Sequence, residues 1–185
     1  MKLYKDSDAS LAPLAGKTVA VLGYGNQGQA QALNLRDSGV TVIVGNRDDP
    51  YRERAQVDGF APLSILEAAT AGDILLVLTT DESQPLIWAE QILPGLRAGK
   101  TVVWSSGYNV GFNLIIPPPD VDVIMIAPRM IGATVRELYL QGSGALAQIA
   151  VQQDASGQAW DTMLALCKGM GLTRGGVFES SFREE

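Results

Sequence analysis

The segment that decides the fold spans residues 18–28 and has the sequence TVAVLGYGNQG. Its first five residues are mostly apolar and rich in valine, which predicts a buried strand. The turn that follows has the spacing G-x-G-x-x-G, with glycines at Gly23, Gly25 and Gly28. A helix is predicted directly after the turn, over residues 27–38, with Gly39 at its end. A glycine turn between a strand and a helix is the context in which this motif binds a dinucleotide.

Each glycine of the motif is expected to have a separate physical role. The first permits the tight turn, the second lets the backbone approach a pyrophosphate, and the third lets the helix pack closely on the strand. The helix N-terminus adds free N–H groups and a partial positive charge. We therefore predict that this turn binds NAD(H) or NADP(H), a glycine-rich turn without a ligand being the alternative. The predicted contacts are Gly23, Tyr24, Gly25, Asn26, Gln27 and Gly28.

Strands and helices are predicted to alternate along the rest of the chain. The further strands span residues 41–45, 73–78, 101–105, 122–127, 147–152 and 175–179, and the further helices span residues 51–58, 64–71, 82–93 and 156–169. Ser64 and Glu67 have the spacing of a capping box at one helix start. Short, continuously apolar strands are typical of a parallel sheet covered on both faces. The predicted fold class is therefore α/β, a doubly wound, mostly parallel Rossmann-type sheet in a single domain over residues 1–185, with residues 1–16 as an N-terminal arm.

Composition narrows the possible functions. The chain has 185 residues, of which 46% are hydrophobic and 18% charged, as expected of one folded domain. A net charge of −6 repels the phosphates of nucleic acid, so no nucleic-acid partner is predicted. No apolar run approaches the roughly 18–20 residues of a membrane span, and the N-terminus does not resemble a signal peptide. We therefore expect no membrane association and a cytoplasmic location.

The chain has no histidine, so a carboxylate, Lys, Arg, Tyr, a hydroxyl group or a cofactor would have to carry any catalysis.

The loop after the second strand is where the adenosine ribose is expected. Asp48 lies 20 residues after Gly28, the usual spacing of an acidic residue that hydrogen-bonds the ribose. Asp48 and Asp49 favour NAD(H), since a carboxylate repels a 2′-phosphate, whereas Arg47 favours NADP(H). The two aspartates tilt the prediction towards NAD(H) without settling it, and a plain solvated turn is the alternative for either one.

Four separated motifs together resemble the N-terminal domain of ketol-acid reductoisomerase. They are GYGNQGQAQALNLRDSGV (23–40), DVDVIMIAPR (120–129), RELYLQGSG (136–144) and VQQDASGQA (151–159), and the resemblance extends from Thr18 to Glu185. It implies a domain that binds NADPH or, less often, NADH. It also implies a second, helical domain whose carboxylates bind two Mg²⁺ ions. The family's reaction, part of branched-chain amino-acid biosynthesis, is alkyl migration in a 2-acetohydroxy acid followed by hydride transfer to the 2-keto product.

The resemblance also assigns roles to residues in later loops. The loop 80–84 matches a cofactor-facing Pro-Asp-Glu-x-Gln segment of the family, with Thr80 in place of the proline. Ser106 stands where the family has a histidine near the nicotinamide, and Arg129 stands where it has an active-site lysine. A second family histidine corresponds to Ala133. The further cofactor contacts that the resemblance implies are Thr79, Thr80, Asp81, Gln84, Ser105 and Gly107.

Ser106 and Arg129 are therefore the candidate catalytic residues. Arg129 is a fixed cation that can clamp a substrate carboxylate, and Ser106 can hydrogen-bond a carbonyl. No Asp/Glu cluster with metal-binding spacing is present, so no metal site is predicted in this chain. Mg²⁺ is expected only if a missing second domain supplies its ligands.

Three functions follow as hypotheses. The first is an NAD(P)-dependent oxidoreductase, or its cofactor-binding domain, that acts on a small molecule of the 2-keto acid type. The second is a non-catalytic NAD(P)-binding or regulatory module, and the third is a subunit completed by a partner chain. Because a domain this small needs another layer to enclose nicotinamide and substrate, we expect a homo-oligomer or a partner helical domain.

Overall fold

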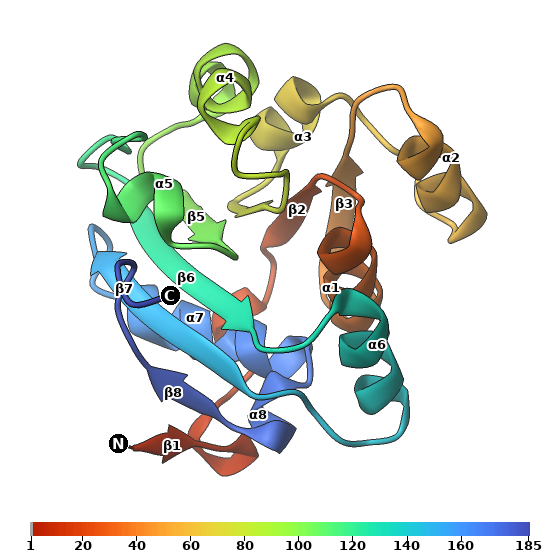
Figure 1. Cartoon of the computed structure of the whole chain (residues 1–185), viewed down its shortest axis with the longest axis vertical. Helices are drawn as coiled ribbons and strands as arrows, with labels where there is room; N and C mark the ends of the chain where they lie inside the picture. Colours follow the sequence, from red (N-terminus) through yellow and green to blue (C-terminus); the bar gives the residue numbers. More distant parts are fainter. Residues whose placement is uncertain (1) are drawn as a thin grey trace.

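The computed structural model describes residues 2–185 and contains one sheet with helices on both faces (Figure 1). Its eight strands lie in the order β1-β8-β7-β6-β5-β4-β2-β3. The strands are β1 (Leu3–Tyr4), β2 (Thr18–Leu22), β3 (Thr41–Gly45), β4 (Ile74–Val77), β5 (Thr101–Trp104), β6 (Asp122–Pro128), β7 (Ala147–Gln153) and β8 (Val177–Glu179). The α-helices are α1 (Asn26–Asp37), α2 (Pro50–Val57), α3 (Ile65–Ala71), α4 (Gln84–Ile87), α5 (Tyr108–Gly111), α6 (Gly132–Leu140), α7 (Ala159–Gly169) and α8 (Leu172–Gly175).

The strand order places a topological switch beside β2. From β2 the chain moves to β3 on one side, and it then returns to β4 on the other. These three strands, β5 and β6 are parallel, so their carboxyl ends meet at one edge of the sheet. The strand β7 is antiparallel to β6, and β1 is antiparallel to β8. The predicted doubly wound, mostly parallel sheet is confirmed, and ligands of such sheets bind at the switch point.

Side chains alternate along each strand between two apolar layers. In β2, Val19 and Val21 pack with α1, α6 and α7. Ala20 and Leu22 pack with α3 and with the helical segment Trp88–Ile92. All four side chains are fully buried. The strands are therefore covered on both faces, which explains why they are apolar at consecutive positions. No helix within residues 2–185 is long and apolar enough to cross a membrane.

Several predicted element boundaries need correction. The predicted N-terminal arm contains β1, in which Leu3 pairs with Phe178. This strand was not predicted, because two residues are too few to show periodicity. The helix predicted over residues 82–93 begins at Gln84, becomes a π-helix at Trp88–Ile92 and ends as a 3-10 turn at Leu93–Gly95. The helix predicted from Ser156 begins at Ala159. The strand predicted over residues 175–179 begins at Val177, since Gly175 belongs to α8.

The helix α6 was not predicted at all, although it touches the glycine-rich motif. It packs along α1, and a Cβ at Gly132 would lie 2.0 Å from the carbonyl oxygen of Asn26. Arg136 donates a hydrogen bond to Asn34, which is fully buried in α1, and forms an ion pair with Asp37. The two helices therefore share a polar interface whose partners are about 100 residues apart, which local periodicity does not reveal.

Candidate dinucleotide site

The glycine turn is held tightly against the neighbouring strands. The amide of Gly23 donates to the carbonyl oxygen of Gly45 at 2.8 Å. Gly23 has a φ of +97°, and a Cβ there would lie 3.0 Å from the carbonyl group of Leu78. A Cβ at Gly28 would lie 2.0 Å from the carbonyl oxygen of Gly23. Both positions therefore exclude a side chain for structural reasons, as the motif predicts for its first and third glycines.

Gly25 differs from the other two because a Cβ there would meet nothing within 4 Å. It is the N-cap residue of α1, with a φ of −74° that other residues also adopt. Within residues 2–185, no N-cap side-chain bond closes this helix start, and its first turn has no acidic residue. The first N–H groups of α1 therefore have no capping side chain, and no acidic side chain lies in that turn, which suits a phosphate.

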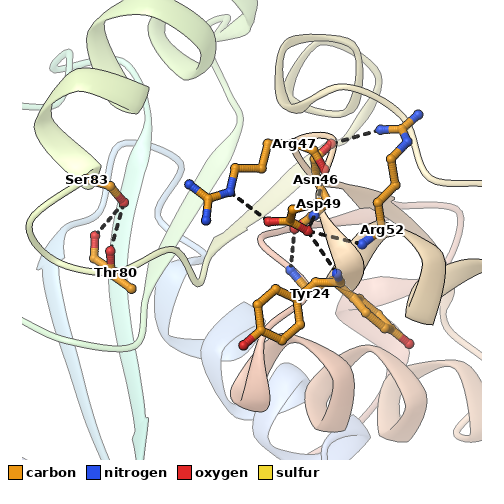
Figure 2. A network of polar contacts seen from close by, with 8 residues as sticks. Tyr24, Asn46, Arg47, Asp49, Arg52, Thr80 and Ser83 are labelled. Carbon is orange, nitrogen blue, oxygen red and sulfur yellow. Dashed lines mark hydrogen bonds and ion pairs between the residues drawn. The ribbon is translucent and has the colours of Figure 1, made fainter.

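The loop after β3 is organised around the carboxylate of Asp49 (Figure 2). This carboxylate accepts hydrogen bonds from Arg47 Nε at 2.7 Å and from Asn46 Nδ2 at 2.8 Å. It also caps α2, since it accepts from the amides of Tyr51 and Arg52. Partial burial raises the pKa of Asp49, but these hydrogen bonds, led by that from Arg47, outweigh it and lower the pKa overall. Asp49 is therefore a fixed anion at the edge of the site.

The neighbouring side chains of this loop have different environments. Asn46 is buried, and its Oδ1 accepts from the amide of Tyr24 at 2.9 Å, which joins the loop to the glycine turn. The guanidinium of Arg52 donates to the carbonyl oxygens of Asn46, Pro62 and Leu63. Arg47 and Asp48 are exposed. Asp48 and Asp49 therefore differ in their environments. Asp49 caps α2, whereas Asp48 has no cap role and is exposed to solvent.

The loop after β4 places Thr79 directly beside the glycine turn. Its Cγ2 lies 3.1 Å from the position of a Cβ on Gly23. Its hydroxyl is one of two side-chain polar atoms, with Trp104 Nε1, that are buried without a hydrogen-bond partner in the described part of the chain. A buried hydroxyl without a partner is costly unless a ligand or water satisfies it. Thr79 and the open helix start beside it therefore fit a bound dinucleotide.

Gln84, at the start of α4, and Asp81, in the loop before it, have different roles. Gln84 was predicted to contact the cofactor, yet it is only 2% exposed, and its amide is bonded at both ends to protein groups. Thr80 is exposed, and its hydroxyl hydrogen-bonds that of Ser83 (Figure 2). Burial raises the pKa of Asp81, with an opposing contribution from the Ser106 hydroxyl and a smaller upward one from Glu82. Asn109 Nδ2, in α5, donates to the carbonyl oxygen of Asp81 at 2.9 Å, so the loop after β4 contacts the segment after β5.

A line of side-chain contacts connects α1 to the ends of β5 and β6, and of its members Gln27 and Ser105 were predicted whereas Gln31 was missed. Gln27 donates to the carbonyl oxygen of Met130, and the buried Gln31 donates to Gln27 and to the hydroxyl of Ser105. Ser105 in turn donates to the carbonyl oxygen of Ile126. The spacing of Gln27 and Gln31, one helical turn apart, was the available signal, because a buried amide on a helix needs a partner. Asn26 accepts a hydrogen bond from the amide of Ala133 and so links α1 to α6.

Arg129 and the backbone of Gly107, the residue after Ser106, lie near one carboxylate. Glu185 accepts a hydrogen bond from the amide of Gly107 at 2.9 Å and lies 3.5 Å from Arg129 Nη1. The Arg129 side chain is about half exposed, at 52%, and also donates to Gln148 at 3.1 Å. Ser106 accepts a weak hydrogen bond from the amide of Tyr108 at 3.3 Å. Glu185 was not predicted as a site residue, and nothing in its local sequence indicates this long-range contact.

No group of three or more potential metal ligands comes together within residues 2–185. The Mg²⁺ centre that the resemblance implies belongs to a second, helical domain, and residues 2–185 bring no ligand set of their own together. The remaining site residues follow four neighbouring strands, β3, β2, β4 and β5, and Arg129 follows the next one, β6. They line the carboxyl edge of the sheet, across its switch point.

Comparison with known proteins is consistent with this geometry. The family model described as acetohydroxy acid isomeroreductase, NADPH-binding domain, matches residues 13–176. Ketol-acid reductoisomerases (NADP(+)) of Methanopyrus kandleri and Pyrobaculum arsenaticum are 52% and 51% identical over the whole chain. The chain spans 57% and 56% of their lengths.

A solved structure gives the same result in three dimensions. It is an NADH-preferring ketol-acid reductoisomerase from an uncultured archean, 43% identical, with a TM-score of 0.98. The match covers 100% of this chain and 58% of that one. The chain therefore belongs to the ketol-acid reductoisomerase (acetohydroxy acid isomeroreductase) family, within the region that corresponds to the family's NADPH-binding domain.

Proposed function

We propose that this domain binds a nicotinamide adenine dinucleotide along the carboxyl edge of its sheet, as the cofactor-binding part of a ketol-acid reductoisomerase. The observation that carries the proposal is the uncapped start of α1 at Gly25, next to the buried, unpartnered hydroxyl of Thr79. Residues 23–28 would hold the pyrophosphate through backbone N–H groups. Asp48 and the Asp49 loop would hold the adenosine ribose, and residues 79–81 and 105–107 would line the path towards the nicotinamide.

The proposed reaction is the reduction of a 2-keto acid that arises by alkyl migration from a 2-acetohydroxy acid. The bound dinucleotide supplies the hydride. Arg129 would orient the substrate carboxylate through its guanidinium, whose charge is partly balanced by Glu185 at 3.5 Å. Ser106 would donate a hydrogen bond to a substrate carbonyl, as it follows β5 at the carboxyl edge of the sheet. The family's metal chemistry requires ligands from outside this domain, and no step is derived through it.

A further layer of protein is part of the proposal. The edge that carries the site is open in this domain, and an enclosed nicotinamide and substrate need a cover. We propose that a helical domain, on the same chain or on a partner, or a second copy of the domain supplies it. We further propose a cytoplasmic location, on the basis of the composition.

Gly25→Ala tests the proposed phosphate site without disturbing the fold. A methyl group at this position meets no protein atom within 4 Å, so the melting temperature should change by only a few degrees. The same methyl group intrudes where the backbone must approach a pyrophosphate, so the Kd for NADH should rise by at least about tenfold. Tryptophan-to-nicotinamide fluorescence transfer measures the Kd, and calorimetric unfolding serves as the control. Unchanged affinity in a folded variant would place the phosphates elsewhere.

The charges of the β3–α2 loop support NADH as the preferred cofactor. An arginine at this place would normally favour the 2′-phosphate of NADPH. Arg47, however, is paired with Asp49 at 2.7 Å, and Arg52 donates to backbone carbonyl oxygens. The carboxylate of Asp49 already occupies the N-terminus of α2, where a phosphate would otherwise be stabilised. A 2′-phosphate would therefore meet a fixed negative charge in place of a free cation.

Asp49→Ser separates this charge from the structural role of the cap. Serine is also a good N-cap, so the free energy of unfolding should fall by no more than about 1 kcal/mol. Removal of the carboxylate frees Arg47 and the helix N-terminus, so the NADPH/NADH affinity ratio should rise about tenfold or more, from the Kd of each cofactor. Glu53→Gln, an exposed change in α2, is the matched control and should leave the ratio unaltered. A ratio that does not move in Asp49→Ser would show that Asp49 does not select the cofactor.

The replacement of a histidine by Ser106 and a lysine by Arg129 favours a second candidate, a cofactor-binding module without catalysis. The two candidates differ in turnover. If the domain belongs to an active enzyme, the full-length protein with Mg²⁺ should oxidise NADH in the presence of a 2-acetohydroxy acid. Arg129→Met should then raise the KM for that acid by about tenfold or more, because the contact to the substrate carboxylate is lost. Cofactor binding without turnover, for a panel of 2-acetohydroxy and 2-keto acids, would establish the module instead.

A further inference from the structure

Asn109 links two loops of the site from a buried position. It lies in α5, is only 1% exposed, and was not among the predicted site residues. Its Nδ2 donates to the carbonyl oxygen of Asp81 at 2.9 Å and to Oε1 of Gln84 at 2.8 Å. Gln84, itself 2% exposed, donates through Nε2 to the carbonyl oxygen of Thr79 at 2.9 Å. Two amides in series therefore connect α5 to both ends of the Thr79–Asp81 segment.

The same asparagine is also fixed from its other side. Its backbone carbonyl oxygen accepts from the amides of Leu114 and Ile115 at 2.8 and 2.9 Å. If either side-chain amide left its partner, a buried polar group would lose its hydrogen bond, which costs about 1–3 kcal/mol. The spacing between the loop after β4 and the loop after β5 is therefore set by hydrogen-bond lengths.

The strand order says which part of a dinucleotide these loops face. The adenosine ribose is expected at the end of β3, and the pyrophosphate at the start of α1 after β2. The strands β4 and β5 lie on the opposite side of β2 from β3. A dinucleotide that starts at β3 and crosses β2 therefore runs next past Thr79 and Asp81 and then past Ser106.

We propose that Asn109 is a positioning residue for the nicotinamide half of the cofactor, and this rests on the proposed function. Through Gln84 it holds the backbone of Thr79, whose buried hydroxyl has no partner within residues 2–185, and through its own Nδ2 it holds the backbone of Asp81. Both segments are thereby kept in place for the nicotinamide nucleotide. The adenosine half is held by the β3–α2 loop, which the two amides do not touch. Loss of Asn109 should therefore weaken contacts to one half of the ligand alone.

Comparison of NADH with ADP-ribose, which lacks the nicotinamide, tests this proposal. In Asn109→Ala the Kd for NADH should rise about tenfold, while the Kd for ADP-ribose should change by less than about twofold. Gln84→Met keeps the length of the side chain and removes both amide functions, so it should show the same split. Asn113→Gly is the matched control, because it removes a nearby exposed amide and keeps a backbone with a φ of +58°. Isothermal titration measures all four proteins, wild type included.

Other outcomes would overturn the proposal. An equal loss of affinity for NADH and ADP-ribose would make Asn109 a purely structural residue, and an unchanged NADH affinity would remove its role. Should both variants fail to fold, the side-chain amide resonances of Asn109 and Gln84 in the wild type decide, since they should shift with NADH and stay fixed with ADP-ribose. A folded wild type that binds neither ligand would refute the proposed function itself.

Discussion

The close approach of α1 to the end of β2 is the constraint on which the site depends. A side chain at Gly28 would place its Cβ 2.0 Å from the carbonyl oxygen of Gly23, so only glycine lets the helix begin this near the strand. This approach directs the first N–H groups of α1 over the carboxyl edge of the sheet. The topological switch beside β2 then puts the β3 loop on one side and the β4 and β5 loops on the other. An anion bound at the helix start would thereby be flanked by loops on both sides, as the proposed dinucleotide requires.

Buried amides hold those loops in place. Asn46 fixes the β3 loop to the glycine turn, Gln84 and Asn109 fix the β4 loop to α5, and Gln31 fixes the end of β5 to α1. Each is 5% exposed or less. Neutral amides satisfy one another without adding charge near the phosphate position, which buried carboxylates or ammonium groups would do. The fixed anion of Asp49 is the exception, and it stands where it would discriminate between the two dinucleotides.

Local sequence predicted those parts of the fold that local interactions determine. The bounds of β2 and β3, the glycine turn and the capping box of Ser64 and Glu67 are confirmed, because each depends on neighbours a few residues away. The helix α6 and the contacts of Asn109 and Glu185 were missed, since their partners lie roughly 25 to 110 residues distant along the chain. Gln84 shows the intermediate case. Its motif pointed to the loop after β4, and its burial and hydrogen bonds show that it holds that loop from within.

Backbone amide shifts measured by NMR during titration with NADH test the central claim most directly. The account predicts that the largest changes occur at Gly25, Asn26 and Gln27, where phosphate oxygens would accept hydrogen bonds from the start of α1. Smaller changes should follow at the ends of β3, β4 and β5. Changes confined to another surface, such as the hollow of about 320 Å³ lined by Val110, Asn113 and Arg183, would contradict it.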